Sequence, residues 1–489
     1  ARYGYHVFSD QDYESRVRGG SNFFRVRASQ IPVNAIDEKV DVLMSFSRQG
    51  IEQHRHEVSP MGLIVYDSET IGNLNVNDSL SVPAAGLSRE ATGDVQTANT
   101  VLLAAILTVL GYDSESLITL LREYFRGEAA EKNVKAAQAG FRYAKEHTNI
   151  KLPTKLKTIG NKNRMLINGN EALAMGAIAA GCKFMAAYPM TPVISLIEYM
   201  AAKAAEFEIA VVPAEDEIGA MNMVVGASYA GVRAMTATSG GGFCLMVEGL
   251  GLAAMTETPV VVVEGQRPGP AIGLPTRQEQ GDLDFVLHAS HGEFLRVILT
   301  PSTAEECFWA ALRAFNLAEK YQVPVIVMTD HHLATSYSAI ERFDLTKVEI
   351  DRGLLYSGTG IDYKRYLFTA NGISPRAFPG KPAVLVVADS DEHDEAGHLT
   401  EDPAIRSRMV NKRLGKLAAL REEIKLPKLW GAEKPEIILI GWGSTFGAIR
   451  EAVTILNETG LKIAHLHFNE IWPFPKDKVA GVLQDCPNV

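Results

Sequence analysis

The chain has 489 residues, of which 46% are hydrophobic and 22% charged, and its formal net charge is −10. This length is typical of about three domains, and the composition is that of a globular protein with large buried cores. The negative charge argues against nucleic-acid binding, and no apolar run is long enough to cross a bilayer. No signal peptide is recognised. The four cysteines form no CxxC pair, which favours a cytoplasmic protein with reduced thiols and no metal or iron–sulfur ligands.

Residues 1–150 indicate a first α/β domain, because short strand-like segments precede amphipathic helical patterns. The strands are expected at residues 4–8, 23–27 and 40–45, and the helices at 99–110, 114–124 and from there to about 148. Residues 151–164 carry five Lys or Arg side chains around a Pro and a Gly, which is typical of a linker.

From residue 165 to 345 the pattern alternates between short apolar strands and helices, which is typical of a parallel sheet covered on both faces. The strands are expected at 183–187, 209–212, 233–238, 259–264, 295–299 and 324–328, and the helices at 170–180, 218–229, 242–255 and 304–321. Ligands of such sheets bind at the carboxyl ends of the strands.

Residues 346–381 show no regular pattern and are interpreted as a connector. A third α/β unit is expected within residues 382–489, with strands at 436–440 and 462–466 and a helix at 446–457 between them.

The first candidate site is the loop Tyr188-Pro189-Met190-Thr191-Pro192, which follows a predicted strand and precedes a predicted helix. Thr191 suits an N-cap and Pro192 the first helical position, so a structural role alone explains both residues. In the alternative interpretation, the Thr191 hydroxyl and nearby amides lie at a strand's carboxyl end and contact a ligand.

Glu215-Asp216-Glu217 opens the following helix. Carboxylates in a first turn usually complement the helix dipole, and this is the structural alternative for all three residues. Glu217 differs because its helix face, at positions 220, 221, 224 and 225, carries Ala, Met, Val and Val, so its carboxyl group is expected to be partly desolvated. Thiamine-type cofactors need such a group, because a protonatable Glu hydrogen-bonds the aminopyrimidine ring and favours its imino tautomer.

Two further loops follow predicted strands. In Thr238-Ser239-Gly240-Gly241-Gly242, backbone amides either cradle an anion or form a tight packing turn, and the segment lacks the Lys and the spacing of a nucleotide loop. Arg267 is held between a core strand and a Pro-Gly-Pro turn, which suits a rigid carboxylate site. Its structural alternative is an ion pair with Glu264 or Glu217. Arg277 is a second, less constrained candidate.

Taken together, these segments resemble the fused γ–α subunit of 2-oxoacid:ferredoxin oxidoreductases. The matching segments are YPMTP (188–192), AEDEIGA (214–220), TSGGG (238–242), QRPGP (266–270) and GLPTRQEQ (273–280). Weaker likeness extends over most of the chain, including residues 12–27, 374–413 and 436–475.

The resemblance implies a thiamine-diphosphate-binding, pyrimidine-type doubly wound parallel sheet at residues 165–345. It would be flanked by a γ-type α/β domain at 1–150 and a transketolase-C-like α/β domain at 382–489. Compared with the family, the γ-type domain is expected to lack its first strand–helix unit and the last domain to stop early.

The resemblance also assigns roles to residues. Glu217 is similar to the glutamate that activates the aminopyrimidine ring, Arg267 to the arginine that binds the 2-oxoacid carboxylate, and Thr191 to the threonine that helps to hold substrate. The remaining residues expected to contact the cofactor are Tyr188, Pro189, Ser239 and Gly240.

The family's diphosphate–magnesium motif and its cluster cysteines are absent from this sequence. The resemblance therefore implies a β subunit that carries Mg²⁺ and a [4Fe-4S] cluster, an active site at the α–β interface, and an (αβ)₂ assembly. The chain itself is assigned no metal ligand.

The implied reaction is the oxidative decarboxylation of a 2-oxoacid with coenzyme A to acyl-CoA and carbon dioxide, with ferredoxin as the electron acceptor. Fusion of γ to α favours 2-oxoglutarate, with pyruvate or a branched-chain 2-oxoacid as alternatives. Two other classes stay open at this point: a non-oxidative thiamine enzyme, and a non-catalytic subunit that binds coenzyme A or a nucleotide.

Overall fold

The structure is a computed structural model that describes residues 4–16, 19–74, 76, 78–150, 152, 164–358, 362–380, 384–484, 486 and 488. The chain divides into two compact units, one formed by Asp37–Ile159 and the other by Ala1–Ile36 together with Gly160–Val489. Apart from residues 152 and 164, the predicted linker at 151–164 lies outside the described residues.

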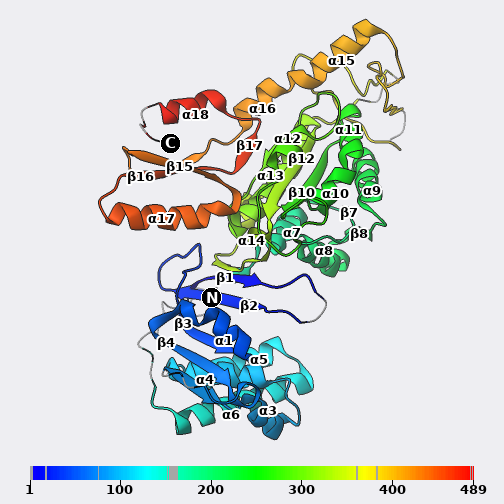
Figure 1. Ribbon diagram of the computed structural model, residues 1–489. Coiled ribbons are helices and arrows are strands. Elements are labelled where there is room, and N and C mark those ends of the chain that lie inside the picture. Colours follow the sequence, from blue (N-terminus) through cyan, green and yellow to red (C-terminus); the bar gives the residue numbers. More distant parts are fainter. Residues whose placement is uncertain are drawn as a thin grey trace. The chain divides into compact units, whose positions relative to one another are not determined.

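The smaller unit is built on a parallel sheet in which β4 (Val58–Asp67) lies between β3 (Val40–Ser45) and β5 (Ser79–Val82). Side chains of β4 alternate between two cores. Leu63 and Val65 belong to the core that includes residues of α4 (Ala98–Val109) and α6 (Gly127–His147), whereas Ile64 and Tyr66 belong to the other. Figure 1 shows α4 and α6 beside this sheet. Other α-helices among the described residues of the unit are α1 (Arg48–His54), α2 (Ser68–Ile71), α3 (Ala84–Thr92) and α5 (Ser114–Tyr124).

The larger unit contains a seven-stranded sheet with the order β17-β11-β12-β10-β9-β7-β8. Six of its strands run parallel, and only β17 runs antiparallel, against β11. The strands are β7 (Phe184–Ala187), β8 (Ala210–Pro213), β9 (Ala234–Thr238), β10 (Val260–Gln266), β11 (Val297–Leu299), β12 (Pro324–Asp330) and β17 (Glu470–Trp472). The six parallel strands lie where the sequence predicts them, and the doubly wound parallel sheet is confirmed.

Helices cover both faces of this sheet. In β10, Val261 and Val263 belong to a core shared with α7 (Gly169–Ala179), α8 (Ile194–Phe207) and α13 (Ala304–Tyr321). Val260 and Val262 belong to the core on the opposite face. That core is shared with α9 (Glu217–Tyr229), α10 (Gly240–Leu245), α11 (Val247–Met255) and α12 (Leu283–His288).

The helix predicted at residues 242–255 is thus two helices, α10 and α11. The break falls at Met246, whose amide bonds to the Phe243 carbonyl three residues earlier. This tighter turn ends α10 before α11 begins.

The first two strands of the chain belong to the larger unit. They form a separate four-stranded antiparallel sheet with the order β2-β1-β13-β6. Its strands are β1 (His6–Asp12), β2 (Phe23–Ser29), β6 (Met165–Ile167) and β13 (Ser338–Ile340). Sequence patterns placed residues 1–36 in the first domain, whereas in the structure they belong to the larger unit. The reason is that β1 pairs with β13, for example Phe8 with Ser338, more than three hundred residues away.

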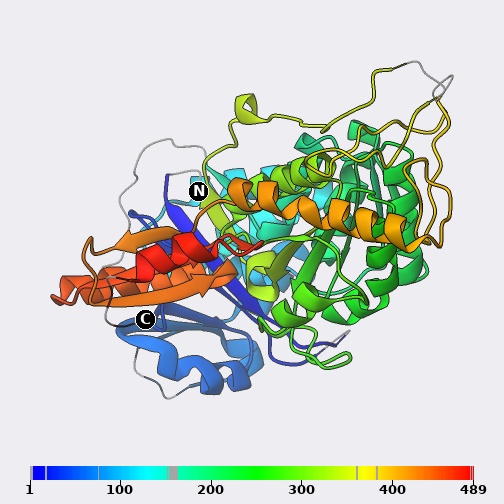
Figure 2. The same ribbon diagram turned by 90° about the horizontal axis from the view of Figure 1, so that it is seen from above.

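The C-terminal part contains a three-stranded sheet with the order β14-β16-β15. Its elements are β14 (Lys428–Gly431), β15 (Ile437–Trp442), β16 (Ile463–Phe468), α17 (Phe446–Glu458) and α18 (Lys476–Leu483). Two helices precede it, α15 (Pro403–Gly415) and α16 (Leu417–Glu423), and Figure 2 shows α15 as one of the long helices of this part. The short helix α14 (His331–Thr335) follows β12. No described helix is both long and apolar enough to span a membrane.

Candidate functional site

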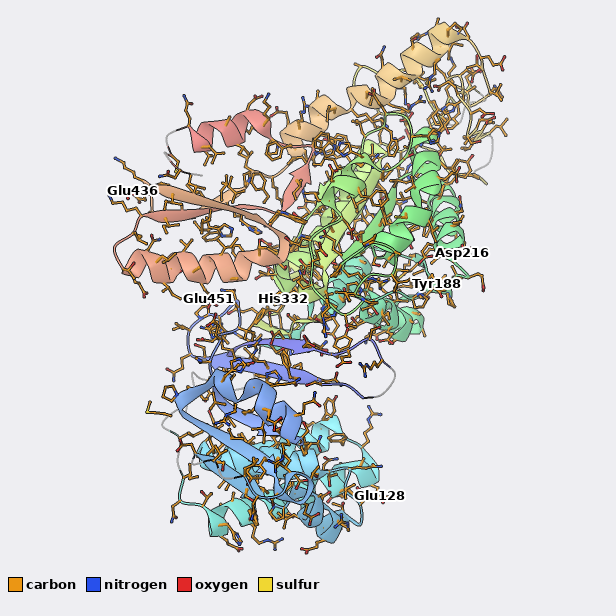
Figure 3. The ribbon with its side chains drawn as sticks, in the orientation of Figure 1. Glu128, Tyr188, Asp216, His332, Glu436 and Glu451 are labelled. Atoms are coloured by element: carbon orange, nitrogen blue, oxygen red, sulfur yellow. The ribbon has the colours of Figure 1, made fainter. Side chains whose placement is uncertain are left out.

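Glu217 is the first residue of α9, which follows the carboxyl end of β8. Asp216 is the N-cap, and its Oδ1 accepts a hydrogen bond from the Gly219 amide at 2.7 Å. Because Asp216 caps the helix, the Glu217 carboxyl group does not have to, and it turns into the protein with only 3% of the residue exposed. Tyr188 directly follows β7 and Asp216 follows β8, its paired neighbour, and both residues are labelled in Figure 3.

The Glu217 carboxyl group has an unsatisfied oxygen. Oε1 is buried and has no hydrogen-bond partner among the described residues. It lies over Gly242, where an added Cβ would be 2.6 Å from Oε1 and 2.1 Å from Thr238 Oγ1. An unpaired polar atom in the interior costs about 1–3 kcal/mol. Gly242 therefore lets the Glu217 and Thr238 side chains pack closely over it, and the unpaired Oε1 is an acceptor that a ligand donor could satisfy.

Arg267 follows directly after β10 and is 8% exposed. Its Nη1 donates to the Thr191 carbonyl at 2.7 Å. Burial lowers the pKa of Arg267, and the Asp282 carboxylate partly opposes this effect. Within the described part of the chain Arg267 forms no ion pair, so the predicted alternative of a pair with Glu264 or Glu217 is wrong. Its other guanidinium N–H groups are therefore available to an anionic ligand.

Arg277, the second candidate, is already paired. Its Nη1 donates to Asp12 Oδ1 at 2.7 Å and to the Tyr13 carbonyl at 3.2 Å. These contacts tie the loop after β10 to β1 and leave Arg277 with a structural role.

The structure of the loop after β7 shows that the prediction of Thr191 as a helix N-cap is wrong. Helix α8 begins at Ile194 with Val193 as its N-cap, because a turn closed by the Val193 amide and the Met190 carbonyl at 3.0 Å comes first. Thr191 is therefore not the N-cap, and its carbonyl instead accepts the bond from Arg267.

The other predicted cofactor contacts lie on the same edge of the sheet. Tyr188 and Pro189 are exposed, whereas Ser239 and Gly240 are buried. Ser239 Oγ donates to Met190 Sδ at 2.8 Å, which joins the loops after β9 and β7. An added Cβ on Gly240 would lie 2.4 Å from Asp282 Oδ2. Gly240 thus permits close packing, and a cofactor contact of Ser239 or Gly240 stays a prediction.

The sequence interpretation missed a group of acids at this edge. Glu264 lies inside the apolar strand β10 and is fully buried. Burial, and then the nearby Asp282 and Asp330 carboxyl groups, raise the pKa of Glu264 well above its ordinary value. Asp330 Oδ2 accepts from Gln280 Nε2 at 2.9 Å and from the Ser444 hydroxyl at 2.5 Å. An acid in an otherwise apolar strand was the available signal.

Loops from the carboxyl ends of neighbouring strands thus converge. Glu217 follows β8, Thr191 follows β7, and Arg267 follows β10. A hydrogen bond joins Arg267 to the Thr191 carbonyl, and the Glu217 carboxyl group packs against Gly242, which follows β9. A buried acid and a guanidinium with one hydrogen bond thus lie at the edge where open α/β sheets bind their ligands, and this edge is the candidate site.

Three family models match the chain. The model described as "pyruvate flavodoxin/ferredoxin oxidoreductase, thiamine diP-bdg" covers residues 175–412. "Pyruvate ferredoxin/flavodoxin oxidoreductase" covers residues 1–143, and "pyruvate:ferredoxin oxidoreductase core domain II" covers residues 435–489. The fold and the site therefore define a subunit of a thiamine-dependent oxidoreductase.

Individual relatives indicate which thiamine-dependent oxidoreductases the chain is similar to. The α subunit of a 2-oxoacid:ferredoxin oxidoreductase from a Sulfolobus species is 33% identical, over 98% of this chain and 84% of the relative. The 2-oxoglutarate synthase subunit KorA of Methanothermobacter thermautotrophicus is 38% identical, over 65% of this chain and 84% of its own. The structure of a 2-oxoglutarate:ferredoxin oxidoreductase from Magnetococcus marinus, with 2-oxoglutarate, coenzyme A and succinyl-CoA bound, superimposes with a TM-score of 0.92. It is 32% identical and covers 99% of this chain and 86% of that one. The chain belongs to the α subunits of the 2-oxoacid:ferredoxin oxidoreductase family.

Proposed function

We propose that this chain works with a β subunit to catalyse the oxidative decarboxylation of a 2-oxoacid with coenzyme A. The products are acyl-CoA and carbon dioxide, and ferredoxin receives the electrons. The observation that carries the proposal is the buried Glu217 carboxyl group, whose Oε1 has no hydrogen-bond partner among the described residues. Family membership favours this oxidative reaction over a non-oxidative thiamine enzyme or a non-catalytic binding subunit.

The residues at the site fit the aminopyrimidine ring of thiamine diphosphate. Glu217 Oε1 is an acceptor without a donor, and Gly242, having no side chain, lets the Glu217 carboxyl group pack against it. When bound, thiamine diphosphate supplies the nucleophilic carbon that 2-oxoacid decarboxylation requires. In this proposal Glu217 exchanges a proton with a ring nitrogen and holds the ring in its reactive tautomer. Tyr188, Pro189, Ser239 and Gly240 are proposed to line the ring's surroundings.

Arg267 is proposed to bind the carboxylate of the 2-oxoacid. One of its N–H groups donates to the Thr191 carbonyl, and the others form no hydrogen bond to the described residues. A planar guanidinium held in this way is suited to bidentate binding of a carboxylate. Thr191 is proposed to help hold the substrate from the adjacent loop.

The β subunit is proposed to cover this edge of the sheet. Several large apolar side chains around the site are exposed, and a partner would remove them from water. They are Tyr188 (42% exposed), Ile218 (49%), Leu245 (49%), Ile272 (66%) and Leu274 (58%). The sequence contains neither a diphosphate–magnesium motif nor clustered cysteines. We therefore assign Mg²⁺ and a [4Fe-4S] cluster to the β subunit of an (αβ)₂ assembly.

We propose 2-oxoglutarate as the preferred substrate. The support is the 2-oxoglutarate synthase relatives and the Magnetococcus marinus enzyme, whose structure contains 2-oxoglutarate and succinyl-CoA. An assay of the purified complex against 2-oxoglutarate, pyruvate and branched-chain 2-oxoacids tests this choice. A higher kcat/KM for pyruvate would replace 2-oxoglutarate as the proposed substrate.

The central experiment compares two glutamates that are two residues apart. The chain is co-expressed with its β subunit, and 2-oxoacid-dependent reduction of a viologen dye is measured with and without coenzyme A. Glu217→Gln should lower kcat on the order of 10²–10⁴-fold, the usual contribution of a positioned acid–base group. Glu215 is exposed, so Glu215→Gln is the matched control and should keep the wild-type rate. Undiminished activity in Glu217→Gln would refute the proposal.

A further inference from the structure

The loop after β7, at residues 188–193, is held by side chains from two other parts of the sheet domain. Two consecutive carbonyl groups of this loop accept hydrogen bonds. Arg267 Nη1 donates to the Thr191 carbonyl at 2.7 Å. Asn170 Nδ2 donates to the Pro192 carbonyl at 2.8 Å. The loop is thus fastened at neighbouring residues, by the arginine that follows β10 and by an asparagine of α7.

Asn170 is the second residue of α7 and is fully buried. The helix does not need it as a cap, because Asn168 and Glu171 form a complete capping box. Asn170 Nδ2 instead donates to the Pro192 carbonyl and, at 2.9 Å, to Ser195 Oγ in the first turn of α8. Both donor bonds of the Asn170 amide are therefore directed at the segment that follows β7.

The oxygen of the same amide has no partner. Asn170 Oδ1 is buried and accepts no hydrogen bond from the described residues. A buried acceptor without a donor lowers stability, so the stability of the core alone would not favour an asparagine here. Its directional donor bonds are suited to fixing one arrangement of the loop.

The loop also packs closely on β10. An added Cβ on Gly265 would lie 2.9 Å from Pro192 Cγ. Pro192 thus contacts the Asn170 amide and also the strand that leads to Arg267. A shift of Pro192 would move Thr191, its neighbour in the chain, and with it the carbonyl that accepts from the Arg267 guanidinium.

We propose that Asn170 is a positioning residue. Its bond to the Pro192 carbonyl fixes the loop after β7, so that Thr191 and Arg267 are held in place for the carboxylate of the 2-oxoacid. The hold on the loop follows from the hydrogen bonds and the packing alone. Its consequence for substrate rests on the proposed function, in which Thr191 and Arg267 bind the 2-oxoacid.

The test uses two substitutions that divide the contacts of Asn170, in the complex of the chain with its β subunit. Asn170→Leu has a side chain of similar size and removes both hydrogen bonds. Ser195→Ala removes only the contact with α8 and leaves the bond to the Pro192 carbonyl in place. A difference between the two variants therefore reports on the bond to Pro192.

Asn133 provides the matched control. It is another buried asparagine on a helix, α6, and it belongs to the other compact unit. Its Nδ2 donates to the Ala129 carbonyl at 2.9 Å, and its Oδ1 accepts from Thr100 Oγ1 at 2.7 Å. Asn133→Leu therefore removes the hydrogen bonds of a buried asparagine without touching the loop after β7.

The first measurement is hydrogen–deuterium exchange of the peptide at residues 188–197, in the complex without substrate. This peptide contains the Val193 amide, which closes a turn with the Met190 carbonyl. Asn170→Leu should accelerate exchange of the peptide about tenfold or more, because the loop loses the buried contact that fixes it. Ser195→Ala and Asn133→Leu should leave its exchange at the wild-type rate.

The second measurement is KM and kcat for the 2-oxoacid. Asn170→Leu should raise KM on the order of tenfold, with a smaller change in kcat, because the groups that bind the carboxylate are displaced. Ser195→Ala and Asn133→Leu should keep the wild-type KM. In an Arg267→Lys background, Asn170→Leu should raise KM little further, since the guanidinium that it helps to position is already lost.

Wild-type exchange in Asn170→Leu would overturn the inference, as would exchange in Ser195→Ala as fast as that in Asn170→Leu. An equal rise of KM in Asn133→Leu would also overturn it, because general loss of stability would then explain the effect. If Asn170→Leu does not accumulate, Asn170→Ala removes the same hydrogen bonds without added bulk and decides in the same way.

Failure of the proposed function has a different signature. If Arg267→Lys and Thr191→Ala both leave KM for the 2-oxoacid unchanged, the proposed roles of these two residues fail. The exchange measurement on Asn170→Leu needs no substrate, so it still decides whether Asn170 holds the loop.

Discussion

At the amino ends of β9, β10 and β12, each buried carboxylate is surrounded by cations. Glu257, just before β10, pairs with Lys412 and Lys416, and all three side chains are at most 2% exposed. Glu319 pairs with Arg233 at 2.8 Å and Arg376 at 2.7 Å. At the carboxyl ends of the same sheet, Glu217, Glu264 and Asp282 carry buried oxygens with no cation bonded to them among the described residues.

The difference shows two uses of a buried acid within one sheet. A buried charge costs several kcal/mol in desolvation, and opposite charges nearby offset that cost. At the amino edge these ion pairs therefore connect the sheet to helices α15 and α16 and leave no buried carboxylate there uncompensated among the described residues. The carboxyl edge leaves the same kind of group uncompensated, so part of its stabilisation must come from a proton or a ligand. Substitutions at the two edges should therefore differ in their effects on stability, on its pH dependence and on activity.

The largest effect is expected at the amino edge. Glu257→Gln leaves the buried Lys412 and Lys416 without a counter-ion and should lower the free energy of unfolding by about 3–5 kcal/mol. Urea denaturation of the purified chain measures it. Glu436, labelled in Figure 3, pairs with Lys462 on the surface, where both side chains are 62% exposed, so Glu436→Gln should cost less than about 1 kcal/mol. Equal losses of unfolding free energy in Glu257→Gln and Glu436→Gln would contradict the view that the buried ion pairs of the amino edge stabilise the fold.

The two edges should also respond to pH with opposite sign. Glu264 has a raised pKa, so above the ordinary carboxyl value of about 4.3 the folded chain binds more protons than the unfolded chain, and stability falls as pH rises. Glu264→Gln removes this loss, and its stability relative to wild type should increase by up to about 1.4 kcal/mol per pH unit between about pH 5 and 7.

For Glu257, burial alone would raise the pKa, but Lys416 and Lys412 outweigh it and hold the pKa well below its ordinary value. The stability that Glu257 contributes is therefore present at neutral pH and is lost as pH falls below about 4.3. The deficit of Glu257→Gln should shrink in that range. The same measurements of unfolding free energy against pH check both variants, and parallel curves would contradict the assignment of the two edges.

A smaller effect is expected from the glycine beneath Glu217. A Cβ at Gly242 would displace Glu217 Oε1 or Thr238 Oγ1, so Gly242→Ala should lower kcat on the order of tenfold to a hundredfold. Gly226 lies on the same helix as Glu217, and a Cβ there meets nothing within 4 Å, so Gly226→Ala is the control and should keep wild-type activity. Equal rates in the two variants would show that the packing of Glu217 against Gly242 does not matter for catalysis.

The smallest effect is predicted for the stability of Glu217→Gln. Because Oε1 has no partner to lose, the free energy of unfolding should change by less than about 1 kcal/mol, or increase. Urea denaturation of the chain measured without cofactor provides the comparison with Glu257→Gln. A loss as large as that of Glu257→Gln would mean that Glu217 is a structural acid after all.

Local patterns predicted much of the fold. The six parallel strands were located because each is a short apolar run bounded by turn residues, and α13 begins and ends at the predicted residues. Two strands of the smaller unit, β4 and β5, were not predicted. The apolar run of β4 follows Ser59, Pro60 and Gly62, and β5 has only four residues. Strand β17 has three residues, and its place in the central sheet depends on antiparallel pairing with β11.

Some residues of the candidate site were predicted from the sequence, and others were not. Glu217, Thr191 and Arg267 were identified because each follows a predicted strand in a distinctive local segment. Glu264 and Asp282 were missed, since Glu264 is one residue within a strand and Asp282 lies in a different loop.

By itself, the sequence determined the succession of strands and helices, the family resemblance, and the acid and the arginine expected to act, because these are properties of short segments. Only the tertiary structure decided that Arg267 bonds to the Thr191 carbonyl rather than to a carboxylate, and that Glu264 is fully buried. It also decided which buried acids have cations beside them. Electrostatic compensation depends on distances between residues far apart in the chain, and folding alone sets those distances.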